Sequence, residues 1–197
     1  AAIAGSALAL LLIQYFPLIK AEISYQLKTQ EQKQATAVIG ESADTEKRKT
    51  ITAKNPEFGL VIPKLGINVT VIPDVNPNNS KEYQKALAQG VAHARGTSTP
   101  VNQKNTVLFA HSADNFYNAN RYNGIFYLLN KLDLGDKAYV AYQNRIYTYS
   151  VKETRVVGTE DISYMEQKET NHLTLITCWP PGTTLKRLVV VAELASD

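Results

Sequence analysis

Short apolar runs separated by turn residues fill the chain from about Pro56 to its end. Several of them alternate apolar and polar side chains, which is the period of a half-buried β-strand. Regular spacing of such runs is typical of a barrel or a sandwich. The sequence therefore predicts a mainly β domain over 56–197 with one or two short helices. The runs span residues 60–62, 68–72, 105–110, 137–142, 145–157, 173–179 and 188–194.

Turn residues set the expected limits of these elements. Pro63 and Pro73 each follow an apolar run and are expected to end a strand, because proline cannot donate to the ladder. Gln143-Asn144 is expected to join the runs on either side of it as a hairpin. The segment 91–96 is expected to be a connection that precedes the strand 105–110.

One helix is expected over 80–89. Asn79 precedes it as an N-cap, and Glu82 stands three positions on, where a capping-box partner belongs. Gly90 follows as a natural stop. A further helical turn or two is expected in 125–132. The stripe that would pack the first helix on the core consists of Tyr83, Ala86 and Leu87.

The N-terminal residues differ from the rest of the chain. Residues 1–19 carry no charged side chain and are broken only by Gln14 and Pro17. A spanning helix needs about 20 apolar residues, so we expect an uncleaved transmembrane anchor, with a cleaved signal peptide as the alternative. Residues 20–55 are polar and are expected to form a stalk between the anchor and the β domain.

Charge and cysteine content exclude several classes of protein. The net charge is +3, and the seven basic and five acidic residues of 20–55 leave about +1 for 56–197, so nucleic-acid binding is not expected. Cys178 is the only cysteine, so an internal disulfide and a multi-thiolate metal site are both excluded. No metal or cofactor is expected. Cys178 is therefore either a buried small residue or a nucleophile.

A cysteine nucleophile needs a basic partner, because a free thiol is mostly protonated at neutral pH. His172 lies six residues before Cys178 in the same expected strand, roughly 20 Å away at about 3.3 Å per residue. His93 lies in the expected connection and is more typical of a solvated histidine. His111 follows an apolar strand at the mouth of a polar loop, which favours it without excluding a strand-end histidine with no partner.

Arg187 is a candidate third member of the site. If the last two strands pair through the short turn that contains Pro180, Pro181 and Gly182, Arg187 can lie near Cys178. A guanidinium there could support a thiolate or an oxyanion. A surface arginine beside Lys186 is the alternative.

These residues resemble the sortase family of membrane-anchored cysteine transpeptidases. Four stretches carry the resemblance in the family's order, and a fifth, FYLLNKLDLGD (126–136), also suits the family. Together with an N-terminal anchor they are specific, whereas each alone is weak. The four stretches are VIPKLGINVTV (61–71), ALAQGVAHARGTSTP (86–100), NTVLFAHS (105–112) and TLITC (174–178), which Arg187 and LVVVA (188–192) follow.

The resemblance implies an eight-stranded sortase β-barrel with His111 as acid and base, Cys178 as nucleophile and Arg187 steadying substrate and oxyanion. It implies cleavage of an LPXTG-like sorting signal at its Thr–Gly bond through a thioester. A peptidoglycan precursor or a pilin lysine would then supply the accepting amine. The implied partners are surface proteins that bear such a signal, at a bacterial membrane with the barrel outside the cytoplasm. Residues expected to line the peptide site are Ser112, Thr177 and Trp179.

The chain departs from the family's pattern in three places. Ala110 stands where the residue before the histidine is usually glycine, and the stretch from His111 to Phe126 is long and aromatic. Trp179 directly after the cysteine is unusual. The short connection 179–186 places the chain nearer classes C, D and E than class A. No Asp-Pro-aromatic lid precedes the barrel, which favours an anchoring sortase over a pilus polymerase, and no acidic cluster matches the family's calcium site.

Three rival functions are weaker. A papain-like protease has its cysteine before its histidine, on a helix. An L,D-transpeptidase carries an S-H-G-C-type signature that this sequence lacks. A membrane-anchored scaffold barrel with a buried, unreactive Cys178 is the non-enzymatic alternative, and another cysteine acyltransferase or hydrolase is the enzymatic one.

Overall fold

The computed structural model describes residues 22–23, 25–27, 51–113, 124–167 and 170–195. The chain divides into two compact units, and Ile51–Asp197 is the unit that holds the folded domain. The expected anchor over 1–19 and most of the expected stalk over 20–55 lie outside the described residues. Within the described ranges, no helix is long and apolar enough to cross a membrane.

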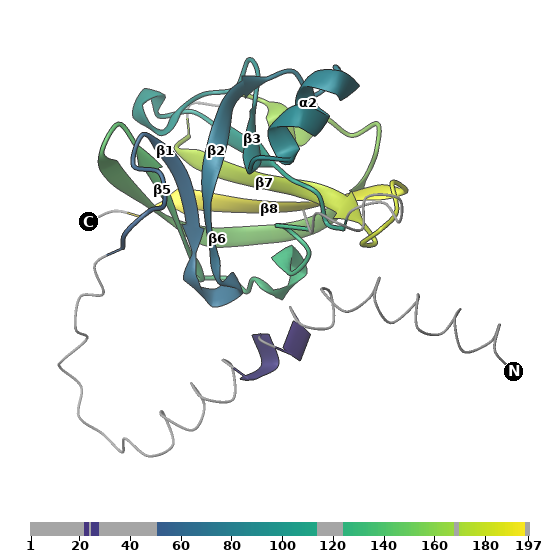
Figure 1. The fold of residues 1–197 in the computed structure, drawn as a ribbon, viewed down its shortest axis with the longest axis horizontal. Coiled ribbons are helices and arrows are strands. Elements are labelled where there is room, and N and C mark those ends of the chain that lie inside the picture. Colours follow the sequence, from purple (N-terminus) through teal and green to yellow (C-terminus); the bar gives the residue numbers. More distant parts are fainter. Residues whose placement is uncertain (1–21, 24, 28–50, 114–123, 168–169, 196–197) are drawn as a thin grey trace, which may run out of the picture. The chain divides into compact units, whose positions relative to one another are not determined.

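Eight strands close into one barrel, as the resemblance implied (Figure 1). Their order around the barrel is β1-β2-β3-β4-β7-β8-β6-β5, and pairing of β1 with β5 closes it. The strands are β1 (Phe58–Ile62), β2 (Ile67–Val75), β3 (Val91–Ala94), β4 (Thr106–Phe109), β5 (Lys137–Tyr142), β6 (Arg145–Gly158), β7 (His172–Trp179) and β8 (Lys186–Leu194).

Local turns and long-range pairings build the sheet together. Gln143 and Asn144 have φ of 49° and 61°, the left-handed backbone of a two-residue hairpin, so the expected β5–β6 turn is confirmed. The β7–β8 hairpin is confirmed as well. Two neighbouring pairs run parallel, β2 with β3 and β4 with β7. The parallel β4–β7 pair is the one that matters for the site, because it joins two segments far apart in sequence.

The inner face of the barrel is filled with aliphatic and aromatic side chains. Strand residues alternate between the two faces of a sheet, so every second residue of a strand points inward. In β7 the inward residues include Leu173 and Leu175, and in β8 they include Leu188, Val190 and Ala192, all of them buried in the main core cluster. The residues between them point outward, which decides where the functional side chains lie.

Helix α2 (Ser80–Leu87) packs against β2 and β3 at one end of the barrel (Figure 1). Asn79 caps it as expected, its side chain accepting a hydrogen bond from the backbone N–H of Glu82. The expected reciprocal bond of a capping box is wrong: the Glu82 carboxylate accepts from the backbone N–H of Asn76, at 2.9 Å. Gly90 is needed for close approach, since a Cβ there would lie 2.2 Å from the carbonyl oxygen of Thr70.

Two expectations from the sequence are corrected by the fold, and a third is confirmed. Pro73 does not end a strand, because β2 continues to Val75 through an irregularity between Ile72 and Val75 where no ladder donor is needed. The segment 91–96 is not a simple connection, since Val91–Ala94 forms the buried strand β3. The helical turn expected in 125–132 is confirmed as the short 3-10 helix Leu129–Lys131.

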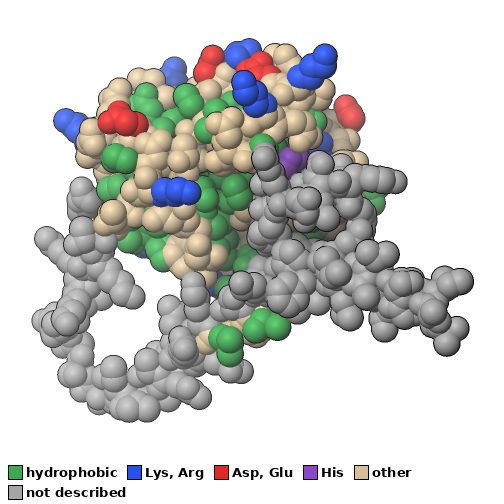
Figure 2. All heavy atoms as spheres, viewed as in Figure 1, with side chains coloured by type: hydrophobic (Ala, Val, Ile, Leu, Met, Phe, Trp, Pro, Cys, Tyr) green, Lys and Arg blue, Asp and Glu red, His purple; other side chains and the backbone are tan. Residues whose placement is uncertain are grey.

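Basic and acidic side chains are interspersed on the face of the domain shown in Figure 2. Among the described residues some basic and acidic side chains pair, such as Lys64 with Asp133 and Asp136, each at 2.6 Å. That face carries no gathered basic surface of the kind that binds nucleic acid.

Candidate active site

His111, Cys178 and Arg187 meet because β4, β7 and β8 are neighbours in the barrel. Cys178 and Arg187 are direct partners across the antiparallel β7–β8 pair. Phe109 is the partner of Ile176 across the parallel β4–β7 pair, so two residues further on His111 comes level with Cys178. The ladder continues to that point, because the N–H of Ala110 donates to the carbonyl of Ile176 at 3.2 Å. Neighbouring strands lie about 4.8 Å apart, so the three residues form one row.

The row lies on the outer face of the barrel. Two positions before Cys178 stands Ile176, and two positions after Arg187 stands Val189, which are themselves partners. Both belong to a small outer apolar cluster with Ala94 and Val107, separate from the main core. Since alternate residues share a face, His111, Cys178 and Arg187 extend this outer surface at the C-terminal end of β7.

Cys178 is a free thiol, half-buried at the end of its strand. Neighbouring backbone is held firmly around it, because the buried hydroxyl of Thr177 donates to the carbonyl oxygen of Ala110 at 2.8 Å. That bond ties the residue before the cysteine to the residue before the histidine. The distance between the two strand ends is therefore set by a buried side chain as well as by the ladder.

His111 is half-buried and is contacted from two sides. Its Nε2 lies 3.2 Å from the side-chain oxygen of Gln84 on α2. Its carbonyl oxygen accepts from the N–H of Phe126 at 3.1 Å, which holds the far end of the segment that follows the histidine. No sequence pattern pointed to Gln84, which lies 27 positions upstream.

Arg187 is half-buried and turns toward its own hairpin loop. Its Nη1 donates to the carbonyl oxygens of Lys186 at 3.1 Å and Thr184 at 3.3 Å. These bonds use one nitrogen of the guanidinium, which has five N–H groups in all. The remaining donors suit it to bind a carbonyl or an oxyanion beside Cys178.

Tyr164 is a neighbour of the row that the sequence did not indicate. It lies in the 3-10 helix Ser163–Met165 and packs on the outer cluster beside Ile176 and Val189. Burial raises the pKa of its phenol, while the charge of Arg187 opposes that rise and Cys178 adds to it. Tyr164 therefore packs on the same outer surface that the row extends.

Asn105 fixes the segment that carries Tyr164. Its side-chain nitrogen donates to the carbonyl oxygens of Tyr164 at 2.8 Å and Glu166 at 3.2 Å. Its side-chain oxygen accepts from the hydroxyl of Thr174 at 2.7 Å. A buried side chain at the start of β4 thus joins this segment to β7, the strand of the cysteine.

The three residues expected to line a peptide site are placed differently from one another. Thr177 and Ser112 are buried, at 3% and 2% exposure. Trp179 is half-buried and packs against the main core, on the opposite face of β7 from Cys178. Their role in binding a peptide stays a prediction.

The other two histidines lie away from the row. His172 begins β7, six residues before Cys178, and its Nε2 lies 3.6 Å from the carboxylate of Glu193. His93 is the direct partner of Leu108 in β4, so it faces inward, and its ring centroid lies 5.5 Å from that of Phe58. The expectation of a solvated His93 is wrong, because the side chain is only 5% exposed.

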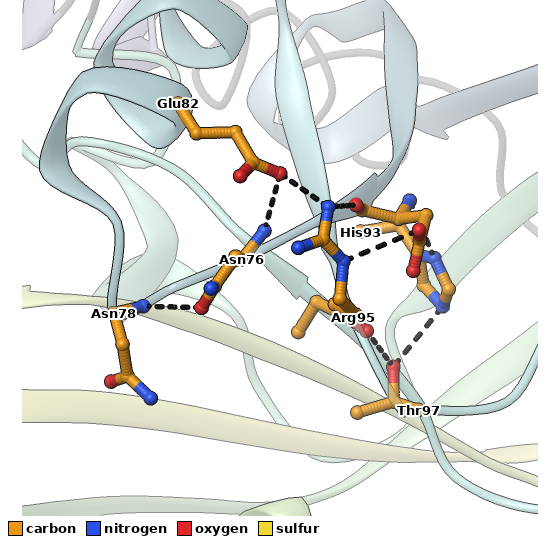
Figure 3. Close-up of polar contacts among 8 residues, drawn as sticks. Asn76, Asn78, Glu82, His93, Arg95 and Thr97 are labelled. Carbon is orange, nitrogen blue, oxygen red and sulfur yellow. Dashed lines mark hydrogen bonds and ion pairs between the residues drawn. The ribbon is translucent and has the colours of Figure 1, made fainter.

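His93 belongs to a polar network beneath α2 (Figure 3). Its Nε2 lies 2.9 Å from the carbonyl oxygen of Ser98 and 3.1 Å from the hydroxyl of Thr97. Nearby, the Arg95 guanidinium donates to Glu82 at 2.6 Å and to the backbone oxygen of Asp74 at 2.8 Å. The network ties α2 to β2 and β3.

Acid is expected to destabilise the fold through His93. Burial lowers the pKa of His93 below the value near 6.5 that it has in an unfolded chain. The unfolded chain then binds a proton that the folded one does not, so stability is complete above about pH 6.5 and falls as the pH drops below it. Urea midpoints between pH 7.5 and 5.5 should fall for the natural chain and fall less for His93→Gln. An equal fall in both chains would refute this assignment.

Among the described residues, no three His, Cys, Asp or Glu side chains gather closely enough to hold a metal ion.

Comparison with known proteins identifies the family. The family model described as the Sortase domain matches residues 60–195. Sortase A of Listeria monocytogenes is 25% identical over 159 residues, which cover 81% of this chain and 63% of that protein. Sortase D of Bacillus subtilis is 26% identical over 192 residues, covering 90% and 88%. The chain thus spans less than two thirds of the length of the Listeria relative that it matches.

Solved structures agree with the sequence comparisons. Sortase C-1 of Actinomyces oris superposes with a TM-score of 0.60 at 27% identity, covering 73% of this chain and 76% of that one. Sortase C of Clostridium perfringens, solved with a C-terminal cell wall sorting motif, has a TM-score of 0.59 at 27% identity, covering 71% and 70%. With its closed eight-stranded barrel and a family match over most of its folded unit, this chain belongs to the sortase family.

Proposed function

We propose that this chain is a cysteine transpeptidase that cleaves an LPXTG-like sorting signal and transfers the released acyl group to an amine. The observation that carries the proposal is the row of His111, Cys178 and Arg187 on three adjacent strands. A thiol, an acid–base group and a guanidinium on one face are the parts that acyl transfer through a thioester requires.

The first half of the reaction forms the thioester. The thiolate of Cys178 attacks the threonine carbonyl carbon of the sorting signal, and the negative charge moves to the carbonyl oxygen. When the carbon–nitrogen bond to glycine breaks, the imidazolium of His111 gives its proton to the leaving amine. The products are an acyl-enzyme on Cys178, a neutral imidazole and a free glycine amine.

The second half reverses these roles. An incoming amine attacks the thioester carbonyl and gives its proton to the imidazole of His111. The sulfur of Cys178 then leaves as a thiolate, which restores the thiolate and imidazolium pair. Because His111 is acid in one half and base in the other, its position relative to Cys178 has to suit both.

Arg187 is assigned to the developing oxyanion and the substrate backbone. It is the register partner of Cys178, and only one of its nitrogens is used by the hairpin loop. Preorganised donors of this kind act when charge develops on the carbonyl oxygen, so their loss lowers kcat more than it raises KM.

Arg187→Ala is expected to lower kcat/KM for a sorting-signal peptide by about 10² to 10³-fold. Lys186→Ala is the matched control, because Lys186 is the adjacent basic residue, is exposed and points to the other face of β8. Steady-state kinetics of both variants would measure the difference. A similar loss for the two variants would show that only net positive charge at the hairpin matters.

The implied partners follow from the chemistry. The acyl donor is a surface protein that carries a C-terminal sorting signal, and the acceptor is an amine such as that of a peptidoglycan precursor or a pilin lysine. The sorting motif in the C. perfringens sortase C structure supports this class of donor for a relative. Such substrates are reached outside the cytoplasm, so we place the barrel on the outer side of a bacterial membrane, held by residues 1–19 as a single-pass anchor.

The class is proposed to be nearer C, D or E than A, because the connection between β7 and β8 covers only the residues from Pro180 to Leu185. A peptide-library cleavage assay with and without candidate amines tests the whole proposal. The expected result is cleavage after threonine in one motif and formation of an amide product with one class of amine. A chain that cleaves no peptide, and whose Cys178 ignores thiol reagents, would instead be a scaffold barrel.

A further inference from the structure

Gln84 is a side chain of α2 that reaches the histidine of the row. Its side-chain oxygen lies 3.2 Å from Nε2 of His111, across 27 residues of sequence. The bond connects a helix packed on β2 and β3 to the end of β4, so it is a tertiary contact rather than a local one. An interaction with the acid–base residue of the proposed reaction bears directly on function.

The rotation and position of α2 are fixed by contacts on its other faces. Glu82, two residues before Gln84, accepts from Arg95 at 2.6 Å and from the backbone of Asn76 at 2.9 Å (Figure 3). Ala86 and Leu87 are buried in the main core. With one face tied to Arg95 and another buried, the exposed Gln84 is presented toward His111.

The geometry assigns a proton to one nitrogen of the imidazole. An amide oxygen can only accept, so Nε2 of His111 is the donor in this bond. Nε2 carries a proton both in that neutral tautomer and in the imidazolium, so the bond persists through the reaction. Nδ1 is then the nitrogen that gives its proton to the leaving amine and takes one from the incoming amine.

We propose that Gln84 is a positioning residue that holds the His111 ring through Nε2, so that Nδ1 exchanges the catalytic proton. This rests on the proposed function of His111. Among the contacts described, the side chain of Gln84 bonds to His111 and not to Cys178, so its effect passes through the orientation of the imidazole. Losing it should therefore lower kcat while leaving peptide binding and the fold almost unchanged.

Three single variants of the full chain test the proposal. Gln84→Met keeps the length of the side chain and removes the acceptor, and it should lower kcat about tenfold with KM changed less than about twofold. Gln84→Glu keeps an acceptor oxygen and has no donor, so it should stay within about threefold of the natural chain. Gln89→Met is the matched control and should leave kcat unchanged, because Gln89 lies just beyond α2 and its side chain bonds only to the carbonyl oxygen of Lys85 among the contacts described.

Alkylation of Cys178 by iodoacetamide gives a readout that needs no peptide. A well-placed imidazolium supports the thiolate, so Gln84→Met should be alkylated more slowly than Gln84→Glu and Gln89→Met. If the natural chain cleaves no peptide but the alkylation rates follow this order, the proposed substrate is wrong and the positioning role of Gln84 is supported. The role of Gln84 is overturned if Gln84→Met matches the natural chain in both assays. It is overturned equally if Gln84→Glu loses as much as Gln84→Met, or if Gln84→Met lowers the urea midpoint while kcat per folded molecule is unchanged.

Discussion

Replacing Cys178 by alanine is expected to abolish cleavage of a sorting-signal peptide, with a loss of about 10⁴-fold or more. Cys178 carries the only thiol of the chain, which is the nucleophile that a thioester mechanism requires. Release of the C-terminal peptide fragment, followed by chromatography, measures the loss.

The fold should survive this change. Cys178 is half-buried on the outer face, so alanine removes one sulfur atom and leaves the core and the Thr177–Ala110 bond in place. Thermal unfolding should move by no more than about 4 °C, which corresponds to less than about 1 kcal/mol. Cys178→Ser is the matched variant, since it keeps a side chain of similar size and should be almost equally inactive. Turnover by Cys178→Ala within tenfold of the natural chain would exclude the thioester mechanism.

Replacing His111 by alanine should lower kcat by about 10³-fold, the usual contribution of a positioned acid–base group. Without the imidazole, the thiolate loses its counter-ion and the leaving amine loses its proton donor. Single-turnover cleavage by His111→Ala, compared with that of the natural chain, measures the effect.

The other histidines provide the comparison for this prediction. His172→Ala should keep kcat within about threefold, because His172 lies at the opposite end of β7 beside Glu193. His93→Gln should act on stability instead of on chemistry, because His93 faces the core and holds Ser98 and Thr97. Equal kinetic losses at His111 and His172 would show that the row is not the reacting site.

Much of the fold could be predicted from local patterns. The turn at Gln143-Asn144 and the pairing of the last two strands follow from alternation and turn residues, which act over a few positions. The pairing of β7 with β8 also brings Arg187 beside Cys178, so the proximity of these two residues could be predicted from the sequence. The alignment of His111 with Cys178 could not be predicted from local patterns. It depends on the parallel pairing of β4 with β7, and two other strands lie between these in the chain.

The corrected elements share a physical cause. Strand β3 has four residues, and all of them are buried, so its sequence shows neither alternation nor a long apolar run. Local pattern therefore favoured a connection there and a solvated His93. Glu82 has the spacing of a capping box, yet it bonds to Asn76 and Arg95, because the guanidinium of Arg95, directly after β3, offers a stronger partner than the helix's own N-cap.

Residues that act on the site from a distance were the least predictable. Gln84 and Tyr164 lie on a helix and a short 3-10 helix whose own patterns explain them as ordinary surface and packing residues. Only the closed barrel brings the first to His111 and the second to the outer surface that the row extends.

The central claim is that Cys178 forms a thioester with the sorting signal, and intact-protein mass spectrometry tests it most directly. The natural chain is incubated with an LPXTG-containing peptide in the absence of added amine and then denatured in acid. The account predicts an adduct with the mass of the peptide up to its threonine, located on Cys178, removed by hydroxylamine and absent from Cys178→Ala. Peptide cleavage that proceeds without any adduct, or with the same adduct on Cys178→Ala, would contradict it.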